Sequence, residues 1–408
     1  MKSSWIYALL VLAAVSLVGW PVKAAPSTQD ATPLHVYDLA WNPDGMEIAV
    51  FASNGVFVYD RAFQLLRYQE MANGAYGGWS SDGTQLIVGS QVWDADTLNV
   101  RFDVDVTVYG GLRGGAQVYS SSGTEISIFD AADGRLIETV PLGYQVEYVR
   151  SNHAGTQIIS GDGKIVSVFD LDRRTRTARY TLPVESMLGF TLNADDTRLV
   201  YSASKRVPQG TPGSTPSPLD PGMAFLTSIG ILDMTIGEVL LESDPLPEAM
   251  FSFSWTGDGT RIAGLSQSGT VYIWNADTLE LLTAFSAAEY PSMMGYSPYG
   301  GVMAVKMEQP EDDSRRPPTP QYLDDMVQPI AALPGGAVQL IVPAPSLDQL
   351  QAISANCDAP IVVEQPGADT QADQLANVIE QVRTLPEGAV PPGCAADLVA
   401  VAEALQGG

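Results

Sequence analysis

Hydrophobic and polar residues alternate with a period of two through most of the chain, in short runs that end at tight turns. The clearest unit is Ala249 to Phe285, in which Phe253 and Trp255 alternate with serines. This is expected of a strand whose successive side chains point to opposite faces. A turn at Asp258-Gly259 ends that strand, and three further short strands follow. The unit therefore predicts four antiparallel strands.

The same strand-and-turn signature recurs along the chain. Its first turn ends at Gly45, Gly83, Gly114, Gly155, Asp196, Gly259 and Gly300. Six units also end their third strand on a hydrophobic residue followed by Asp60, Asp94, Asp130, Asp170, Asp233 or Asn275. One four-stranded unit cannot bury both of its faces, so several must pack around an axis. The sequence predicts an all-β fold, a seven-bladed β-propeller of four-stranded antiparallel blades, over residues 26–342.

These motifs resemble the WD-repeat β-propeller family over about residues 34–342. The aromatic-Asp ending of the third strand and the aromatic-x-Pro-Asp-Gly turn after the first strand are shared with that family. The Gly-His dipeptide and the His of the family's buried hydrogen-bond tetrad have no matching positions, since the chain has only His35 and His153. TolB-like propellers, which carry the same Asp-Gly turns, are a near neighbour.

The N-terminal residues 1–25 read as a secretory signal peptide. Lys2 precedes an apolar run from Trp5 to Trp20, and short residues lead up to Ala24 and Ala25, after either of which cleavage is expected. The alternative is an uncleaved anchor, but the run is shorter than the roughly 20 residues that a spanning helix needs. No Cys lies near the cleavage site. The sequence therefore predicts an exported, soluble product, periplasmic or extracellular.

The chain is strongly acidic, with 47 Asp and Glu against 21 Lys and Arg and a formal net charge of -26. Such a surface repels phosphate backbones and anionic lipid heads, which argues against nucleic-acid or membrane-surface binding. It favours neutral or cationic partners, although solubility alone is an alternative reason for the charge. Hydrophobic residues make up 45% of the chain and charged residues 17%, which argues against general disorder.

Two long connections interrupt the repeat, and each joins a second strand to a third. Residues 205–223 are rich in Pro, Gly, Ser and Thr, and residues 308–336 are rich in Pro and acidic residues. Because strands alternate in direction, all second-to-third connections and all links between blades emerge on one face, here called the insertion face. Long loops on a compact domain are usually binding loops, lids or disordered segments. We expect both connections to be loop insertions on a binding face.

Links between blades add aromatic and acidic residues to the insertion face. The opening that these residues line, here called the mouth, suits a basic or polar peptide, or a glycan stacked on tyrosine. The alternative is that the tyrosines pack between blades and the loops are solvated. The candidate binding residues are Glu70, Tyr76, Tyr109, Tyr144, Glu185, Glu248, Glu289 and Tyr290.

Residues 343–408 change to a helical period. Ser346-x-x-Gln349 is a capping-box pattern that opens the first of three short amphipathic helices. Cys357 and Cys394 are the only cysteines and are best read as one disulfide in an exported protein. Closing this loop would contribute roughly 3 to 4 kcal/mol. A metal site is a weaker alternative, because the tail has no His. The sequence predicts a disulfide-stapled helical domain.

Catalytic motifs are absent from the sequence. No Ser lies in a nucleophile elbow, and no glycine-rich phosphate loop follows a strand. Neither a cofactor nor a metal is predicted. We expect a non-catalytic propeller that acts as a protein- or glycan-binding scaffold through the insertion face. The alternative is a propeller hydrolase that acts on a glycan or peptide with paired carboxylates at the same mouth, since sequence cannot measure their separation.

Overall fold

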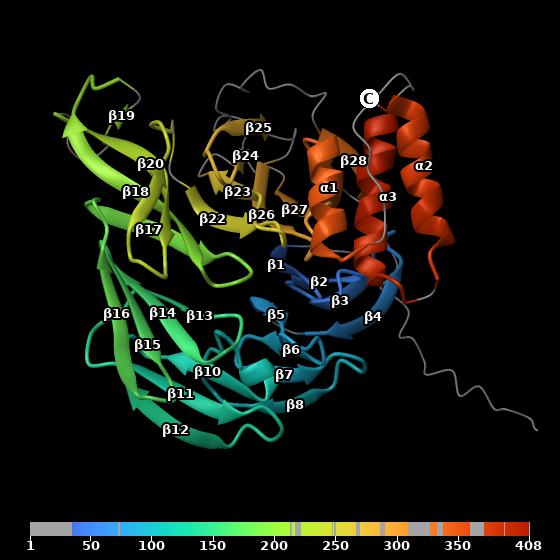
Figure 1. The fold of residues 1–408 in the computed structure, drawn as a ribbon. Helices are drawn as coiled ribbons and strands as arrows, with labels where there is room; N and C mark the ends of the chain where they lie inside the picture. The colour runs from blue at the N-terminus through green and yellow to red at the C-terminus, as the bar shows by residue number, and fades with distance from the viewer. Residues whose placement is uncertain are drawn as a thin grey trace, which may run out of the picture. The chain divides into compact units, whose positions relative to one another are not determined.

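Seven antiparallel sheets follow one another along residues 36–343 and surround a common axis as the blades of a propeller (Figure 1). The structure is a computed structural model that describes residues 35–71, 74–212, 214–216, 222–246, 248, 250–266, 270–285, 290–308, 327–332, 338–359, 371–386 and 388–407. The predicted seven-bladed propeller is confirmed. The predicted signal peptide and Glu289 lie outside the described residues.

First strands of neighbouring blades contact one another, so they lie at the centre of the ring and the fourth strands form its rim. Blade one consists of β1 (Val36–Trp41), β2 (Glu47–Ala52), β3 (Gly55–Asp60) and β4 (Leu65–Glu70). Blade two consists of β5 (Gly77–Trp79), β6 (Gln85–Val88), β7 (Gln91–Asp94) and β8 (Val100–Asp103). Blade three consists of β9 (Gly110–Leu112), β10 (Gln117–Ser121), β11 (Glu125–Asp130) and β12 (Leu136–Pro141), with the 3-10 turn η1 (Arg113–Gly115) after β9.

Blades four to six keep the same order. Blade four consists of β13 (Tyr148–Ser151), β14 (Gln157–Asp162), β15 (Ile165–Asp170) and β16 (Thr175–Thr181). Blade five consists of β17 (Ser186–Leu192), β18 (Arg198–Pro208), β20 (Met223–Asp233) and β21 (Val239–Glu242), with the short β19 (Thr215–Pro216) beside β20. Blade six consists of β22 (Met250–Trp255), β23 (Arg261–Ser266), β24 (Val271–Asn275) and β25 (Leu281–Phe285).

The repeated turn motifs have a backbone cause. The glycine that ends the first turn takes a positive φ in six blades, for example 72° at Gly45 and 71° at Gly259. Asp196 stands at this position in blade five and takes a φ of 61°. Glycine adopts this conformation freely, and Asp tolerates it better than most residues. The residue before each third-to-fourth turn is the Asp or Asn that the sequence marks. Its side chain accepts hydrogen bonds from backbone amides of that turn, at Asp60, Asp94, Asp130, Asp170, Asp233 and Asn275.

A second periodic contact joins the blades to one another. In four blades the residue that ends the first strand donates a side-chain hydrogen bond to a carbonyl in the first strand of the preceding blade. The pairs are Trp41 Nε1 to Gly295 O (3.0 Å), Trp79 Nε1 to Ala40 O (3.0 Å), Ser151 Oγ to Gly111 O (3.3 Å) and Trp255 Nε1 to Thr191 O (3.4 Å). The first of these spans the junction between blades seven and one, where the ring closes.

The two expected loop insertions contain strands. In blade five, β18 and β20 pair along their whole length as an extended hairpin, from Arg198 opposite Asp233 to Pro208 opposite Met223. Residues 205–208 are therefore strand rather than loop. The ladder of backbone hydrogen bonds between the two strands stabilises this extension.

Blade seven does not follow chain order. It consists of β26 (Tyr290–Tyr296), β27 (Met303–Glu308), β28 (Val327–Ala332) and β29 (Val338–Pro343), and its spatial order is β26-β27-β29-β28. The rim strand β28 thus comes from within the expected 308–336 loop and precedes the third strand in sequence. This strand contains Pro329, which a rim strand tolerates because one of its edges needs no ladder partner.

Three C-terminal helices follow: α1 (Leu347–Asn356), α2 (Gln371–Thr384) and α3 (Pro392–Gly407). Their apolar residues join one buried cluster with blades one and seven, in which Val50, Leu340, Ile353 and Leu398 are fully or almost fully buried. Ser346 caps α1 by accepting from Gln349 N, as the capping-box pattern predicts. No helix in the described ranges is long and apolar enough to cross a membrane.

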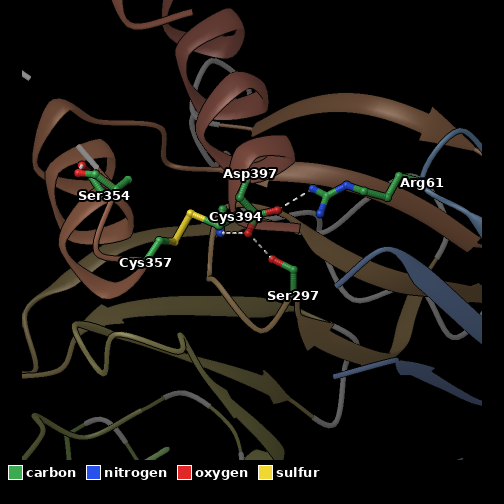
Figure 2. The surroundings of a disulfide bond; sticks show 8 residues. Arg61, Ser297, Ser354, Cys357, Cys394 and Asp397 are labelled. Atoms are coloured by element: carbon green, nitrogen blue, oxygen red, sulfur yellow. Dashed lines mark hydrogen bonds and ion pairs between the residues drawn. A yellow bond between two sulfur atoms is a disulfide. The ribbon is translucent and has the colours of Figure 1, made fainter. Parts of the chain in front are cut away.

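The predicted disulfide joins Cys357 at the end of α1 to Cys394 in the first turn of α3. One turn further along α3, the fully buried carboxylate of Asp397 accepts hydrogen bonds from Ser297 Oγ and from Gly301 N (2.7 Å), both in the first turn of blade seven. It also pairs with Arg61 of blade one. Figure 2 shows this carboxylate between Arg61 and Ser297, close to the disulfide.

Two further contacts attach the start of α1 to the propeller. Arg261 of blade six, itself buried, donates to Ala344 O (2.9 Å) and to Ser346 Oγ (2.8 Å). The Gln349 side chain donates to Gly300 O of blade seven (3.0 Å). The tail therefore bonds to blades six, seven and one, which spans the place where the ring closes.

Candidate functional site

The insertion face carries three exposed tyrosines at the same position on consecutive blades. Each lies three residues before the residue that ends its first strand, so the three are in register. Their exposed fractions are 66% for Tyr76, 49% for Tyr109 and 38% for Tyr148. No other tyrosine in the described part of the chain is as exposed. We call these three residues the tyrosine row.

Neighbouring aromatic rings hold two members of the row in place. Tyr76 meets Tyr37 edge-on with 5.9 Å between ring centroids, and Tyr37 meets His35 in the same way at 4.8 Å. Tyr109 stacks on the buried Tyr119 at 6.5 Å. Rings supported in this way keep their exposed faces available and lose little conformational freedom when a ligand binds.

The residue two positions after each tyrosine shares its side of the strand, because strand side chains alternate between faces. At this position blade two has Gly78 and blade three has Gly111, whereas blade four has Arg150. A Cβ added at Gly78 would meet no atom within 4 Å, so open space borders the row there. Arg150 is exposed, so among these three blades only blade four has a guanidinium at this position.

Three of the predicted binding residues form contacts within the fold. The Tyr144 hydroxyl lies 3.2 Å from Ser160 Oγ, and the Arg176 guanidinium lies 4.9 Å from the Tyr144 ring centroid. Tyr144 also packs against a buried cluster with residues of blades three and four, as the expected alternative of a tyrosine between blades describes. Two of the acids are hydrogen-bonded within the fold, Glu185 by the backbone N of Arg206 (3.1 Å) and Glu248 by the hydroxyl of Tyr272 (3.4 Å).

The structure describes the other predicted residues to different extents. Glu70 is exposed at the end of β4. Tyr290 begins β26, but its side chain lies outside the described ones. Tyr148 was missed by the sequence analysis, which considered the links between blades and not the first residue of a strand. Tyr148 precedes Ser151 by three residues, as Tyr109 precedes Leu112, so an alignment of the ends of the first strands would have identified it.

The opposite face of the ring holds a second polar cluster. There the first turns of blades four and five meet, and the His153 Nδ1 lies 2.6 Å from the Asp196 carboxylate, which also accepts from His153 N (3.0 Å). This hydrogen bond raises the pKa of His153, while partial burial opposes the shift. A cavity of about 160 Å³ adjoins the pair, lined in part by Tyr180 and Met234. In the described ranges no three or more His, Cys, Asp or Glu residues come together as a possible metal site.

Comparison with known proteins places the chain by its fold. No family model matches it, and no curated protein matches its sequence. Among solved structures it is similar to hydrazine synthase of Kuenenia stuttgartiensis, with a TM-score of 0.55 and 14% identity over 70% of this chain and 96% of that one.

The chain is also similar to the β-propeller domain of Cps50 (Swd1) from Myceliophteria thermophila. The TM-score is 0.54 and the identity 12%, over 76% of this chain and 97% of that one. At these identities the similarity shows the fold alone. That fold is shared with a propeller of the WD40 type.

Proposed function

We propose that the chain is an exported, non-catalytic binding scaffold that recognises a protein or glycan ligand on its insertion face. The observation that carries this proposal is the tyrosine row, in which Tyr76, Tyr109 and Tyr148 are exposed in register on consecutive blades. A fold by itself does not define a function, so the argument depends on this site.

The chemistry of the row suits ligands that combine apolar faces with hydroxyl or amide groups. A tyrosine ring offers a flat apolar surface, and its hydroxyl group both donates and accepts hydrogen bonds. Sugars and peptide side chains use both properties. The acidic composition favours a neutral or cationic ligand over an anionic one.

Export is supported by two observations. The sequence of residues 1–25 has the pattern of a signal peptide. The Cys357–Cys394 disulfide is of a kind that persists in oxidising compartments such as the periplasm or the extracellular space.

The alternative, a hydrolase with paired carboxylates at the mouth, makes a different demand on the acids. A glycosidase needs one carboxyl group as acid and a second as nucleophile or base on either side of the scissile bond. Glu185 and Glu248 each accept a hydrogen bond from the protein itself. These contacts support a structural role for both residues and favour the scaffold.

The test is binding of the purified chain to an array of neutral, basic and acidic glycans and to a random peptide library, with release of cleaved products followed in parallel. Tyr109→Ser and Tyr148→Ser should each weaken binding about tenfold or more, since each removes a stacking surface. Tyr144→Phe is the matched control and should leave binding unchanged, because the Tyr144 ring packs on a buried cluster between blades three and four. Binding that survives both serine variants would overturn the proposal, and product release would favour the hydrolase.

A further inference from the structure

A groove of about 620 Å³ runs between blades one and two at the rim. The end of β4 forms one wall through Glu70 and Met71. Blade two forms the other through Val88, Trp93 and Val100. This volume is within the usual range for ligand sites in proteins.

The groove exists because blade two is shorter than its neighbour. The second, third and fourth strands of blade two have four residues each, whereas those of blade one have six. The longer wall of β4 therefore extends past the shortened strands. Val100 on β8 faces the groove and remains 50% exposed, although Trp93 beside it is almost fully buried.

The chemistry of the lining selects a class of ligand. Met71, Val88 and Val100 give it an apolar surface, and Gln69 and Gln91 give it amide groups. Glu70 is exposed, and no Lys or Arg is among the described residues that line the groove. An apolar side chain adjacent to a cation complements this surface, and the net charge of -26 attracts cations from a distance.

The backbone of blade two favours an extended ligand. β8 is the last strand of its sheet, so one edge of its backbone is open for pairing. A peptide that adds to such an edge points alternate side chains to the same side. In a peptide paired with β8, one set of alternate side chains therefore faces the groove, whose opposite wall carries Glu70.

The groove adjoins the tyrosine row. Gly89, which lines the groove, donates its backbone N to Tyr76 O (2.9 Å). The row and the groove therefore lie next to each other at blade two.

We propose that this groove binds an extended peptide segment in which a bulky apolar residue is followed two positions later by Lys or Arg. The inference rests on the proposed function, because it names the ligand class of that binding face as a cationic peptide.

The probe is a random dodecapeptide library displayed on phage and panned against the full chain, followed by fluorescence polarisation with the recovered peptides. Val100→Lys places a cation in the groove, and Leu136→Lys is its matched control. Leu136 occupies the equivalent position on the rim strand of blade three, opposite Phe129 as Val100 is opposite Trp93, and it is 51% exposed. Glu70→Gln tests the charge without adding bulk.

We expect the recovered peptides to be enriched in the apolar-x-basic pattern. Val100→Lys should weaken their binding about tenfold or more, and Leu136→Lys should leave it unchanged. Glu70→Gln should weaken it and reduce its dependence on salt, since an exposed ion pair is screened. Unaltered melting curves of the variants would show that the fold is intact.

Equal binding to the wild-type chain and to Val100→Lys would overturn the inference, as would a library that yields no enriched peptide. If Tyr109→Ser abolishes ligand binding while Val100→Lys does not, the inference fails and the proposed function stands. If neither variant affects any ligand, both fail.

Discussion

Arg61, in the third-to-fourth turn of blade one, pairs with the fully buried carboxylate of Asp397 in α3, 336 residues further along the chain. The Arg61 guanidinium also lies 5.3 Å from the Trp41 ring centroid, and Trp41 is the residue that bonds blade one to blade seven. One charged contact thus connects the helical tail to the junction where the ring closes.

Replacing Asp397 with Ala should lower the free energy of unfolding by about 3 to 5 kcal/mol, because it leaves a largely buried arginine without its partner. Denaturation in urea, followed by tryptophan fluorescence, measures this loss. Glu403→Ala is the control, since the Arg383–Glu403 pair is exposed and should contribute less than about 1 kcal/mol.

An apolar replacement of both partners gives a sharper test of the same pair. Arg61→Met combined with Asp397→Leu should recover most of the stability that Asp397→Ala loses, because neither charge is then left buried. A double variant as unstable as the single one would show that the carboxylate acts through Ser297 and Gly301 and not through Arg61.

Reduction of the Cys357–Cys394 disulfide should lower the melting temperature. Its sequence separation of 37 corresponds to about 4 kcal/mol in the chain-entropy model. Calorimetry with and without a phosphine reductant measures the shift. A variant with both cysteines replaced by Ser should melt at the lower temperature in either condition; an unchanged melting temperature in the reduced wild type would contradict the expectation.

The His153–Asp196 hydrogen bond should make stability depend on pH. The contact raises the pKa of His153 above its value in the unfolded chain. Its contribution is therefore complete below about pH 6.5, the ordinary value for histidine, and is lost as pH rises through the raised pKa. The effect should be small, because the side chain is more than half exposed.

Nuclear magnetic resonance can follow this titration directly, since the chain has only two histidines. Asp196→Asn should lower the midpoint of the His153 resonance. A midpoint that does not move would show that Asp196 is not the cause of the raised pKa.

The bonds between first strands should differ in strength around the ring. Trp41→Phe and Trp79→Phe each remove the donor to a carbonyl of the preceding blade, which costs about 1 to 3 kcal/mol where the acceptor is buried. Trp41→Phe should cost more, because Trp41 also carries the Arg61 cation–π contact and Phe binds a cation less well. Equal losses in urea denaturation would mean that the closing junction is no stronger than an ordinary one.

Features that depend on neighbouring residues were predictable from the sequence. The Asp or Asn at the end of each third strand forms hydrogen bonds within its own turn, and the turn glycines need a positive φ. Each of these short-range requirements recurs in six of the seven blades, so several weak signals reinforce one another. The tail helices and the disulfide follow from equally local patterns.

Long-range contacts were not predictable. β28 lies in a segment rich in Pro, and its place is set by pairing with β29. The burial of Asp397 depends on groups in blades one and seven, so its own helix gives no sign of it. In the candidate site, Tyr76 and Tyr109 are exposed, as the sequence predicts. The residues around Tyr144 in sequence do not indicate that its side chain contacts Ser160 and Arg176.

The reversed order of β28 and β29 bears on how the protein is made. All four strands of blade seven come from one contiguous stretch, so among the described residues no sheet combines strands of blade one with strands of blade seven. During synthesis blades one to six precede Gly295, the residue of blade seven that Trp41 of blade one contacts. Asp397 follows all seven blades in the chain, so its contact with Arg61 forms only after every blade has been synthesised.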